Sequence, residues 1–161
     1  MKNQSTPSPL RTILTAGLLA GTLDGLAASI GFYLNNHKNP ALVFRFIARG
    51  IFGEQASTGG TGMAAAGVFL HYLIAFIWTV VFFLIFPRLK FLSKNLVLSG
   101  MVYGLFIWLV MNVVVLPVSH GISFTFSFPK SLLGLSYIVF LVGLPIGLLI
   151  GRYYRQKTRT A

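Results

Sequence analysis

The sequence predicts an all-α membrane protein, a bundle of four transmembrane helices that forms one domain over residues 1–161. Hydrophobic residues make up 55% of the chain and charged residues only 9%, whereas a soluble domain carries about 25% charged residues. The hydrophobic residues also gather in four long runs, which is the pattern of transmembrane helices. A dispersed soluble domain is therefore excluded, and one integral membrane domain is expected.

Each run is long enough to cross about 30 Å of hydrocarbon at 1.5 Å per residue. The predicted spans are 12–33, 63–86, 96–118 and 132–154. An even number of spans places both termini on one side of the membrane.

The basic residues predict which side that is, because cytoplasmic segments carry the excess of Lys and Arg. Nine of the 13 basic residues lie on the side of the termini: Lys2, Arg11, Arg88, Lys90, Lys94, Arg152, Arg155, Lys157 and Arg159. The other side holds Lys38, Arg45, Arg49 and Lys130. We therefore expect both termini in the cytoplasm.

A short amphipathic helix is predicted over residues 40–49, in the first outer loop. Asn39-Pro40 suits an N-cap followed by Pro at the first helical position, and Gly50 suits the end of the helix. Arg45 and Arg49 lie four residues apart, opposite an apolar side that comprises Leu42, Val43, Phe46 and Ile47. We expect this helix at the outer membrane interface, where the two arginines would contact anionic lipid headgroups or take part in gating.

Asp24 is one of only two acidic residues, and it falls near the middle of the first span. A carboxylate at mid-bilayer costs about 2.5–3.5 kcal/mol on insertion scales, so such residues usually face a bundle interior. Distances along the helices predict that His71 lies at a similar depth in the second span, and Asn112 is a third candidate for this polar network. Arg49 would reach Asp24 if the loop helix dips inward. Two interpretations stay open, a protonatable site on a transport path and a buried polar clasp between helices.

Glycines recur at four-residue spacing in the spans, which lets helix backbones approach closely in lipid. This set is expected to pack helices: Gly17, Gly21, Gly67, Gly100, Gly104, Gly143, Gly147 and Gly151.

Other chemistries find little support in the sequence. There is no cysteine, so thiol chemistry is excluded. His71 is the only histidine within a predicted span, with His37 and His120 in outer loops, so neither a haem nor a metal site is expected. A hydrolase set drawn from Asp24, His71 and Ser29 or Ser136 lacks a nucleophile-elbow context, and we expect no cofactor. The net charge of +11 sits at the ends of apolar runs, which favours anionic lipid over nucleic acid as the partner.

The second half resembles the YagU-like family of bacterial inner-membrane proteins, over roughly Gly67 to Arg152. The resemblance rests on His71-Tyr72-Leu73-Ile74, on Phe86-Pro87-Arg88-Leu89-Lys90, on Ser99-Gly100 and on Pro117 in the next outer loop. It implies a multi-pass protein of the bacterial inner membrane and no particular activity. Members often carry a further histidine in the last span, where this chain has Ser136, Tyr137 and Ile138.

Three functions follow from these observations. The first is a small channel or transporter for an ion or small solute, working as a homo-oligomer through its glycine stripes. The second is an accessory protein without transport activity that uses the same stripes to bind a larger membrane partner. The third is a lipid-binding protein that uses Arg45 and Arg49.

Overall fold

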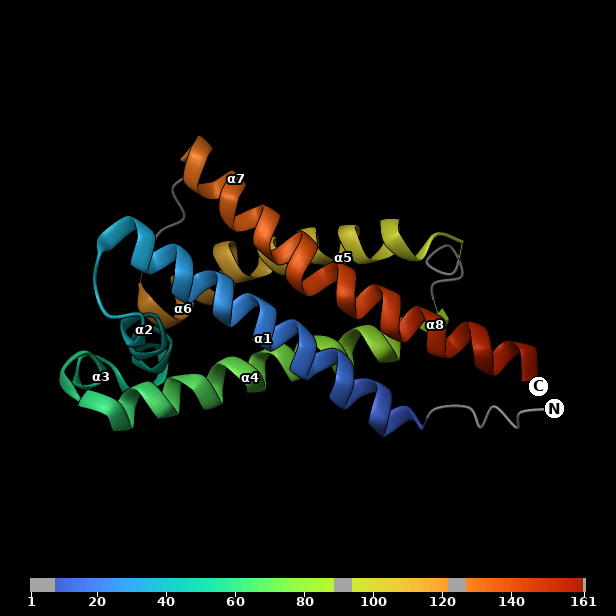
Figure 1. Cartoon of the computed structure of the whole chain (residues 1–161), viewed down its shortest axis with the longest axis horizontal. Helices are drawn as coiled ribbons and strands as arrows, with labels where there is room; N and C mark the ends of the chain where they lie inside the picture. The colour runs from blue at the N-terminus through green and yellow to red at the C-terminus, as the bar shows by residue number, and fades with distance from the viewer. Residues whose placement is uncertain (1–7, 89–93, 122–126, 161) are drawn as a thin grey trace.

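The computed structural model describes residues 8–88, 94–121 and 127–160, and within these every regular element is a helix (Figure 1). The first span is α1 (Pro9–Asn36), and the second is α4 (Gly60–Ile85) followed by a 3-10 turn, η1 (Phe86–Arg88). Between them lie α2 (Ala41–Phe52) and α3 (Gln55–Thr58). The third span is continuous through α5 (Leu96–Val110), η3 (Met111–Val115) and α6 (Leu116–His120). The fourth runs through α7 (Phe128–Tyr137), η4 (Ile138–Gly143) and α8 (Leu144–Thr160).

Helix α1 begins before the apolar run because its first residues supply their own cap. The side chain of Ser8 accepts a hydrogen bond from the backbone N–H of Arg11 at 3.2 Å, and Pro9 occupies a position where no N–H is needed. The helix ends when His37 adopts the left-handed conformation (φ 51°). Polar caps therefore extend the span beyond the predicted limits 12–33.

Helix α2 begins at Ala41, one residue after the predicted start, and ends later than predicted. Asn39 Oδ1 accepts a hydrogen bond from Ala41 N at 2.9 Å. The predicted end at Gly50 is wrong, since the helix continues to Phe52 and stops at Gly53, whose φ of 66° suits glycine. Gly50 instead faces the side chains of Ser119 and His120.

The third and fourth spans each contain a π-helical segment that hydropathy did not predict. In η3 the N–H of Leu116 bonds to Met111 O, and in η4 the N–H of Leu144 bonds to Val139 O, five residues back in each case. Pro117 and Pro145 follow directly. Proline has no N–H and its ring clashes with the carbonyl four residues earlier, so a widened turn is one way to keep the helix continuous.

Glycines set the closest helix contacts. An ideal Cβ at Gly100 would lie 2.8 Å from Gly143 O, and one at Gly147 would lie 2.5 Å from the Gly100 Cα. The third and fourth spans therefore cross backbone against backbone, which only glycine permits. Gly67 gives α2 the same access to α4, because a Cβ there would overlap the backbone of Phe44.

Tyrosine hydroxyls tie α4 to the helices around it. Tyr103 on α5 donates to Trp78 O at 2.6 Å, and Tyr154 on α8 donates to Phe83 O at 3.0 Å. Tyr72 on α4 shares a 2.9 Å hydrogen bond with Thr22 on α1. These bonds surround a core that includes Phe82, Ile107, Ile146 and Ile150.

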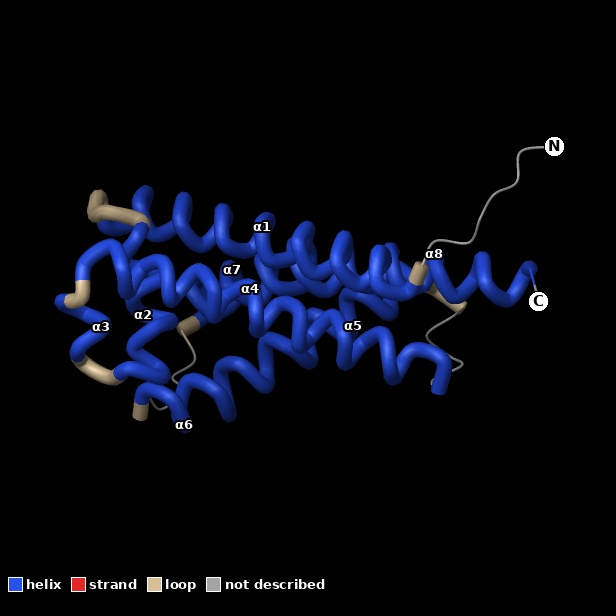
Figure 2. Tube along the Cα trace, turned by 90° about the horizontal axis from the view of Figure 1, so that it is seen from below, coloured by secondary structure: helices blue, strands red, loops and turns tan. Residues whose placement is uncertain are grey.

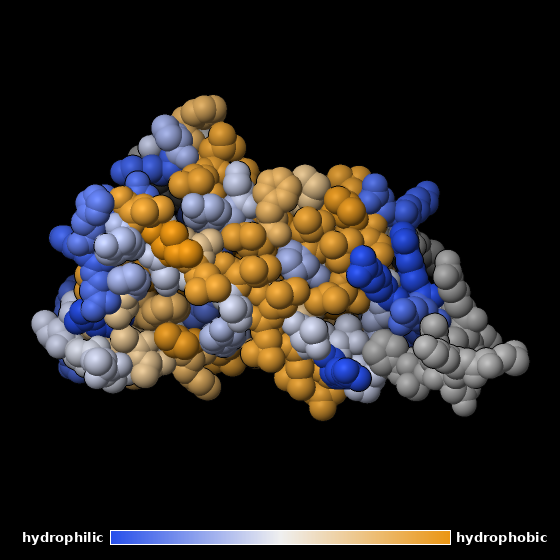
Figure 3. Space-filling model, in the orientation of Figure 1, coloured by the Kyte–Doolittle hydropathy of each residue, from blue (hydrophilic) through white to orange (hydrophobic). Residues whose placement is uncertain are grey.

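Four helices of the described chain are long and apolar enough to cross a membrane, which makes this a multi-pass membrane protein by length and composition. On the face drawn in Figure 3, apolar residues gather over the middle of the molecule and polar residues over its two ends. The start of α1 and the end of α8 lie at the same end of the bundle, and α2 and α3 lie at the opposite end (Figures 1 and 2). Of the basic residues that predicted orientation, Lys2 and Lys90 lie outside the described residues, and the side chain of Arg159 does too.

Candidate functional site

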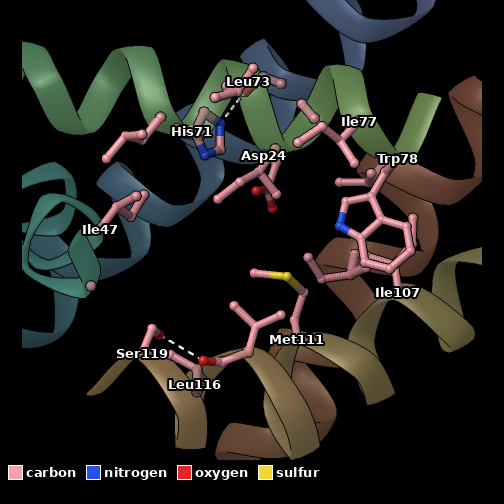
Figure 4. Close-up of a pocket in the computed structure, with 18 of the residues that line it drawn as sticks. Asp24, Ile47, His71, Leu73, Ile77, Trp78, Ile107, Met111, Leu116 and Ser119 are labelled. Atoms are coloured by element: carbon pink, nitrogen blue, oxygen red, sulfur yellow. Dashed lines mark hydrogen bonds between the residues drawn. The ribbon is translucent and has the colours of Figure 1, made fainter. Parts of the chain in front are cut away.

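A partly enclosed cavity of about 450 Å³ lies between α1, α2, α4 and both spans that contain π segments (Figure 4). Its walls are mostly aliphatic and aromatic. The two π segments contribute directly, with Met111 and Val115 from η3 and Ile138 and Val142 from η4. We call this space the main cavity. Its volume falls in the range of about 300–1,000 Å³ that small-molecule sites occupy.

Asp24 supplies the main cavity with its carboxylate. The residue lies on α1 one turn after Gly21, and both residues line the cavity. It is half-buried, and it lies close enough to His71 for the two groups to interact electrostatically. Among the residues that the structure describes, no hydrogen bond or ion pair engages the carboxylate. Asp24 therefore presents its carboxyl group to a mostly apolar space, near the imidazole of His71.

His71 enters the cavity from α4 and also joins that helix to α1. Its Nε2 donates to Gly21 O at 2.8 Å, and Phe44 and Tyr72 meet the ring edge to face. In the neutral ring this donation leaves Nδ1 as an acceptor.

Asn112, the third predicted member of the network, does not line the main cavity. Its Nδ2 donates to Trp108 O at 2.8 Å, one turn back along the same span. The amide donor of Asn112 thus bonds within its own helix rather than across the bundle.

The predicted reach of Arg49 to Asp24 is wrong, because Arg49 forms an ion pair with Glu54, just beyond the end of α2. Arg45 Nη1 donates to Ser57 O at 3.1 Å, while its Nε is buried without a hydrogen-bond partner in the described part of the chain. Both arginines of α2 thus bond to the segment that follows it, Arg49 to Glu54 and Arg45 to Ser57 in α3. Their predicted contact with lipid headgroups or role in gating stays a prediction.

The structure adds His120 and Ser119 to the cavity wall, which sequence reasoning had missed. His120 was expected in an outer loop but is the last residue of α6. Its Nε2 donates to Phe46 O at 2.9 Å, its ring stacks on that of Phe46 at 4.2 Å, and Ser119 Oγ lies 2.7 Å from its Nδ1. Gly121, a left-handed helix end, was the signal that the span extends past 118.

All eight glycines of the predicted packing set lie against another helix of the same chain. Gly17 faces Phe76, Gly21 faces Tyr72, and Gly151 faces Leu96. Gly67, Gly100, Gly104, Gly143 and Gly147 meet neighbouring backbone. The surfaces expected to bind a second copy or a larger partner are therefore occupied within this chain.

Comparison with protein-family models, with curated proteins and with solved structures finds no match for this chain. No relative therefore indicates the chemistry of this site, and the side chains around the main cavity are the guide to it. Across the described residues no three His, Asp or Glu side chains converge as metal ligands. What the main cavity offers is apolar contact, one carboxylate, and two imidazoles whose Nε2 atoms donate to backbone carbonyls.

Proposed function

We propose that this protein is a small membrane transport protein that binds its solute in the main cavity. The solute is a small, mostly apolar molecule with one cationic group. The observation that carries this proposal is the position of the Asp24 carboxylate within apolar walls. Such walls bind apolar surface through dispersion and desolvation, while an unneutralised carboxylate in a low-dielectric site favours a cation strongly.

A pathway for hydrated ions fits the lining less well. Of the side chains that border the main cavity, the polar ones are Asp24, His71, Trp78, Ser119 and His120. Channel filters replace the hydration shell of an ion with rings of carbonyl or charged groups. The polar atoms here are too few and too scattered for that role, so we favour binding of an organic solute over ion conduction.

Binding of tryptamine, an aromatic monocation, tests the proposal against tryptophol, its neutral analogue. Equilibrium dialysis of the detergent-solubilised protein with the radiolabelled compounds is expected to show a preference for tryptamine. Asp24→Asn should weaken tryptamine binding about tenfold or more, as expected for loss of a charge-assisted contact. Glu54→Gln is the matched control, because it removes the other acid, which pairs with Arg49 away from the main cavity. Equal binding of both compounds to every variant would overturn the proposal.

The second candidate is a purely structural clasp, which the hydrogen bond between His71 and Gly21 O favours. A clasp predicts that Asp24→Asn lowers the melting temperature and leaves tryptamine binding unchanged. A transport site predicts that Asp24→Asn weakens tryptamine binding and leaves the melting temperature unchanged. It also predicts that Asp24→Asn abolishes the uptake of tryptamine into proteoliposomes.

The proposed orientation places both termini in the cytoplasm and α2 at the outer interface. Six described basic residues lie at the end of the termini: Arg11, Arg88, Lys94, Arg152, Arg155 and Lys157. Four lie at the other end, where one of them pairs with Glu54. This imbalance supports the orientation. The bacterial inner membrane is the location that the resemblance to the YagU-like family implies, and self-association would have to use surfaces other than the glycine stripes.

A further inference from the structure

A second recess lies at the opposite end of the bundle from α2, between the first turns of α1 and the last turns of α8. It has a volume of about 220 Å³ and is lined by Arg11, Thr12, Thr15, Leu149, Arg152, Tyr153 and Gln156. We call it the arginine groove. It shares no residue with the main cavity.

Arg11 and Arg152 both line this groove, and no Asp or Glu side chain is part of its lining. Arg11 and Arg152 are both exposed, and neither side chain has a hydrogen bond or ion pair in the described part of the chain. The whole chain has only two acids. Asp24 lines the main cavity, and Glu54 pairs with Arg49 beside α3. Neither acidic side chain of the protein is therefore available to the arginine groove, which leaves the groove open to an anion from another molecule.

The walls of the groove fit a group that is anionic at one end and apolar at the other. The hydroxyls of Thr12 and Thr15 already donate to Ser8 O and Arg11 O, so the arginines remain as the strong donors. Guanidinium pairs with phosphate oxygens through two parallel N–H···O bonds. Leu149 and the ring of Tyr153 supply apolar surface beside them. Both helices belong to spans that are long and apolar enough to cross a membrane, and the groove lies near the ends of those spans, where a bilayer has its headgroup region.

We propose that the arginine groove binds a phosphate monoanion, the chemistry of a phospholipid headgroup such as that of phosphatidylglycerol. This site is independent of the proposed transport function. Binding there would fix the depth of α1 against α8 and hold the end of the bundle at the headgroup level.

Native mass spectrometry of the full chain, released from a neutral detergent, tests this proposal. Titration with phosphatidylglycerol is expected to give one preferred bound lipid per chain, which phosphatidylcholine does not give. Arg152→Gln should weaken that binding about tenfold, the loss expected for one hydrogen bond to a charged group. Arg88→Gln is the matched control, because it removes one positive charge at the same end but outside the groove, where Arg88 Nη1 bonds to Leu84 O.

Competition with inorganic phosphate distinguishes the two sources of the anion. Displacement of the lipid at millimolar phosphate would identify the free anion as a ligand, whereas failure to displace it would identify the headgroup with its acyl chains. Either result supports a phosphate site. Equal losses in Arg152→Gln and Arg88→Gln, or equal binding of the two lipids, would mean a diffuse surface charge effect and would overturn the proposal. Circular dichroism and melting of each variant ensure that a loss does not reflect unfolding.

Discussion

At the scale of single residues, the two acids of the chain have opposite surroundings. Glu54 is exposed and paired with Arg49, and an exposed pair of this kind contributes about 0–1 kcal/mol. Asp24 faces the main cavity, whose walls are mostly apolar. The same functional group thus forms an ion pair at the surface in one place and lines an apolar cavity in the other.

His71→Phe tests the hydrogen bond that joins α1 and α4. Phenylalanine keeps an aromatic ring against Phe44 and Tyr72 but cannot donate to Gly21 O. Because hydrogen bonds between membrane helices contribute about 0.6–1.7 kcal/mol, the free energy of unfolding should fall by about 1 kcal/mol. Reversible unfolding in mixed micelles measures this value.

His37→Asn serves as the control for that substitution. It changes the other histidine near α1, at a left-handed position that asparagine tolerates, and should leave the unfolding free energy unchanged. A His71→Phe variant as stable as the parent would show that the bond to Gly21 O adds nothing to the stability of the bundle.

At the scale of elements, the close packing of α2 against α4 depends on a single glycine, Gly67. A Cβ at Gly67 would overlap the backbone carbonyl group of Phe44, which cannot rotate away as a side chain would. Gly67→Ala should therefore displace α2 and destabilise the protein by about 1–3 kcal/mol, as overpacking does. Gly62→Ala is the control, because it lies in the same helix and an added Cβ would meet no neighbouring part of the described structure within 4 Å. Thermal unfolding followed by circular dichroism compares the two, and equal melting temperatures would contradict this account.

The π segment before Pro117 makes a second prediction at this scale. Pro117→Ala restores an N–H and removes the ring, so a regular α-helix becomes available to the third span. Since Met111 and Val115 line the main cavity, a change in their turn should weaken tryptamine binding several-fold while the melting temperature stays level or rises. Pro129→Ala, in the first turn of α7 and outside the cavity lining, should change neither quantity.

The spans were predictable because apolar length dominates the free energy of a helix in lipid. Their ends were less so, since Ser8 and the left-handed His37 extend α1 through local hydrogen bonds that hydropathy does not register. The π segments were not predictable, although Pro117 and Pro145 were visible. A proline within a membrane helix can be accommodated by a kink, by ordered water or by a widened turn, and packing selects among these.

For the site, distances along the helices sufficed to place Asp24 and His71 near one another but not to place Asn112. Depth estimates measure position along the membrane normal and ignore rotation about each helix axis. Asn112 lies in the turn that π geometry widens, so its direction differs from that of a regular helix. The cavity contacts of His120 arise from the fold of α2 over α6, a long-range packing that no local pattern encodes.

At the scale of the whole molecule, the start of α1 and the end of α8 lie at one end of the bundle, and α2 and α3 lie at the other (Figure 1). The chain has no cysteine, so single cysteines report topology without background. Lys94→Cys and Thr158→Cys should react with a membrane-impermeant maleimide only after the cells are permeabilised. Ser57→Cys and Lys130→Cys should react in intact cells. The opposite pattern would reverse the proposed orientation, and reaction at both ends in intact cells would contradict a single topology.

The π turn at Met111–Val115 also determines the direction, around the helix axis, in which the later side chains of the third span point. A π turn holds one residue more than the α-helical turn that it replaces, and each residue of an α-helix turns the chain by about 100°. Deleting one residue from this turn would leave the length and hydropathy of the third span nearly unchanged. It would rotate Ser119 and His120 by more than a quarter turn, away from Phe46 and the main cavity. One additional residue in the π turn therefore sets the rotation of α6, which carries Ser119 and His120, relative to α5.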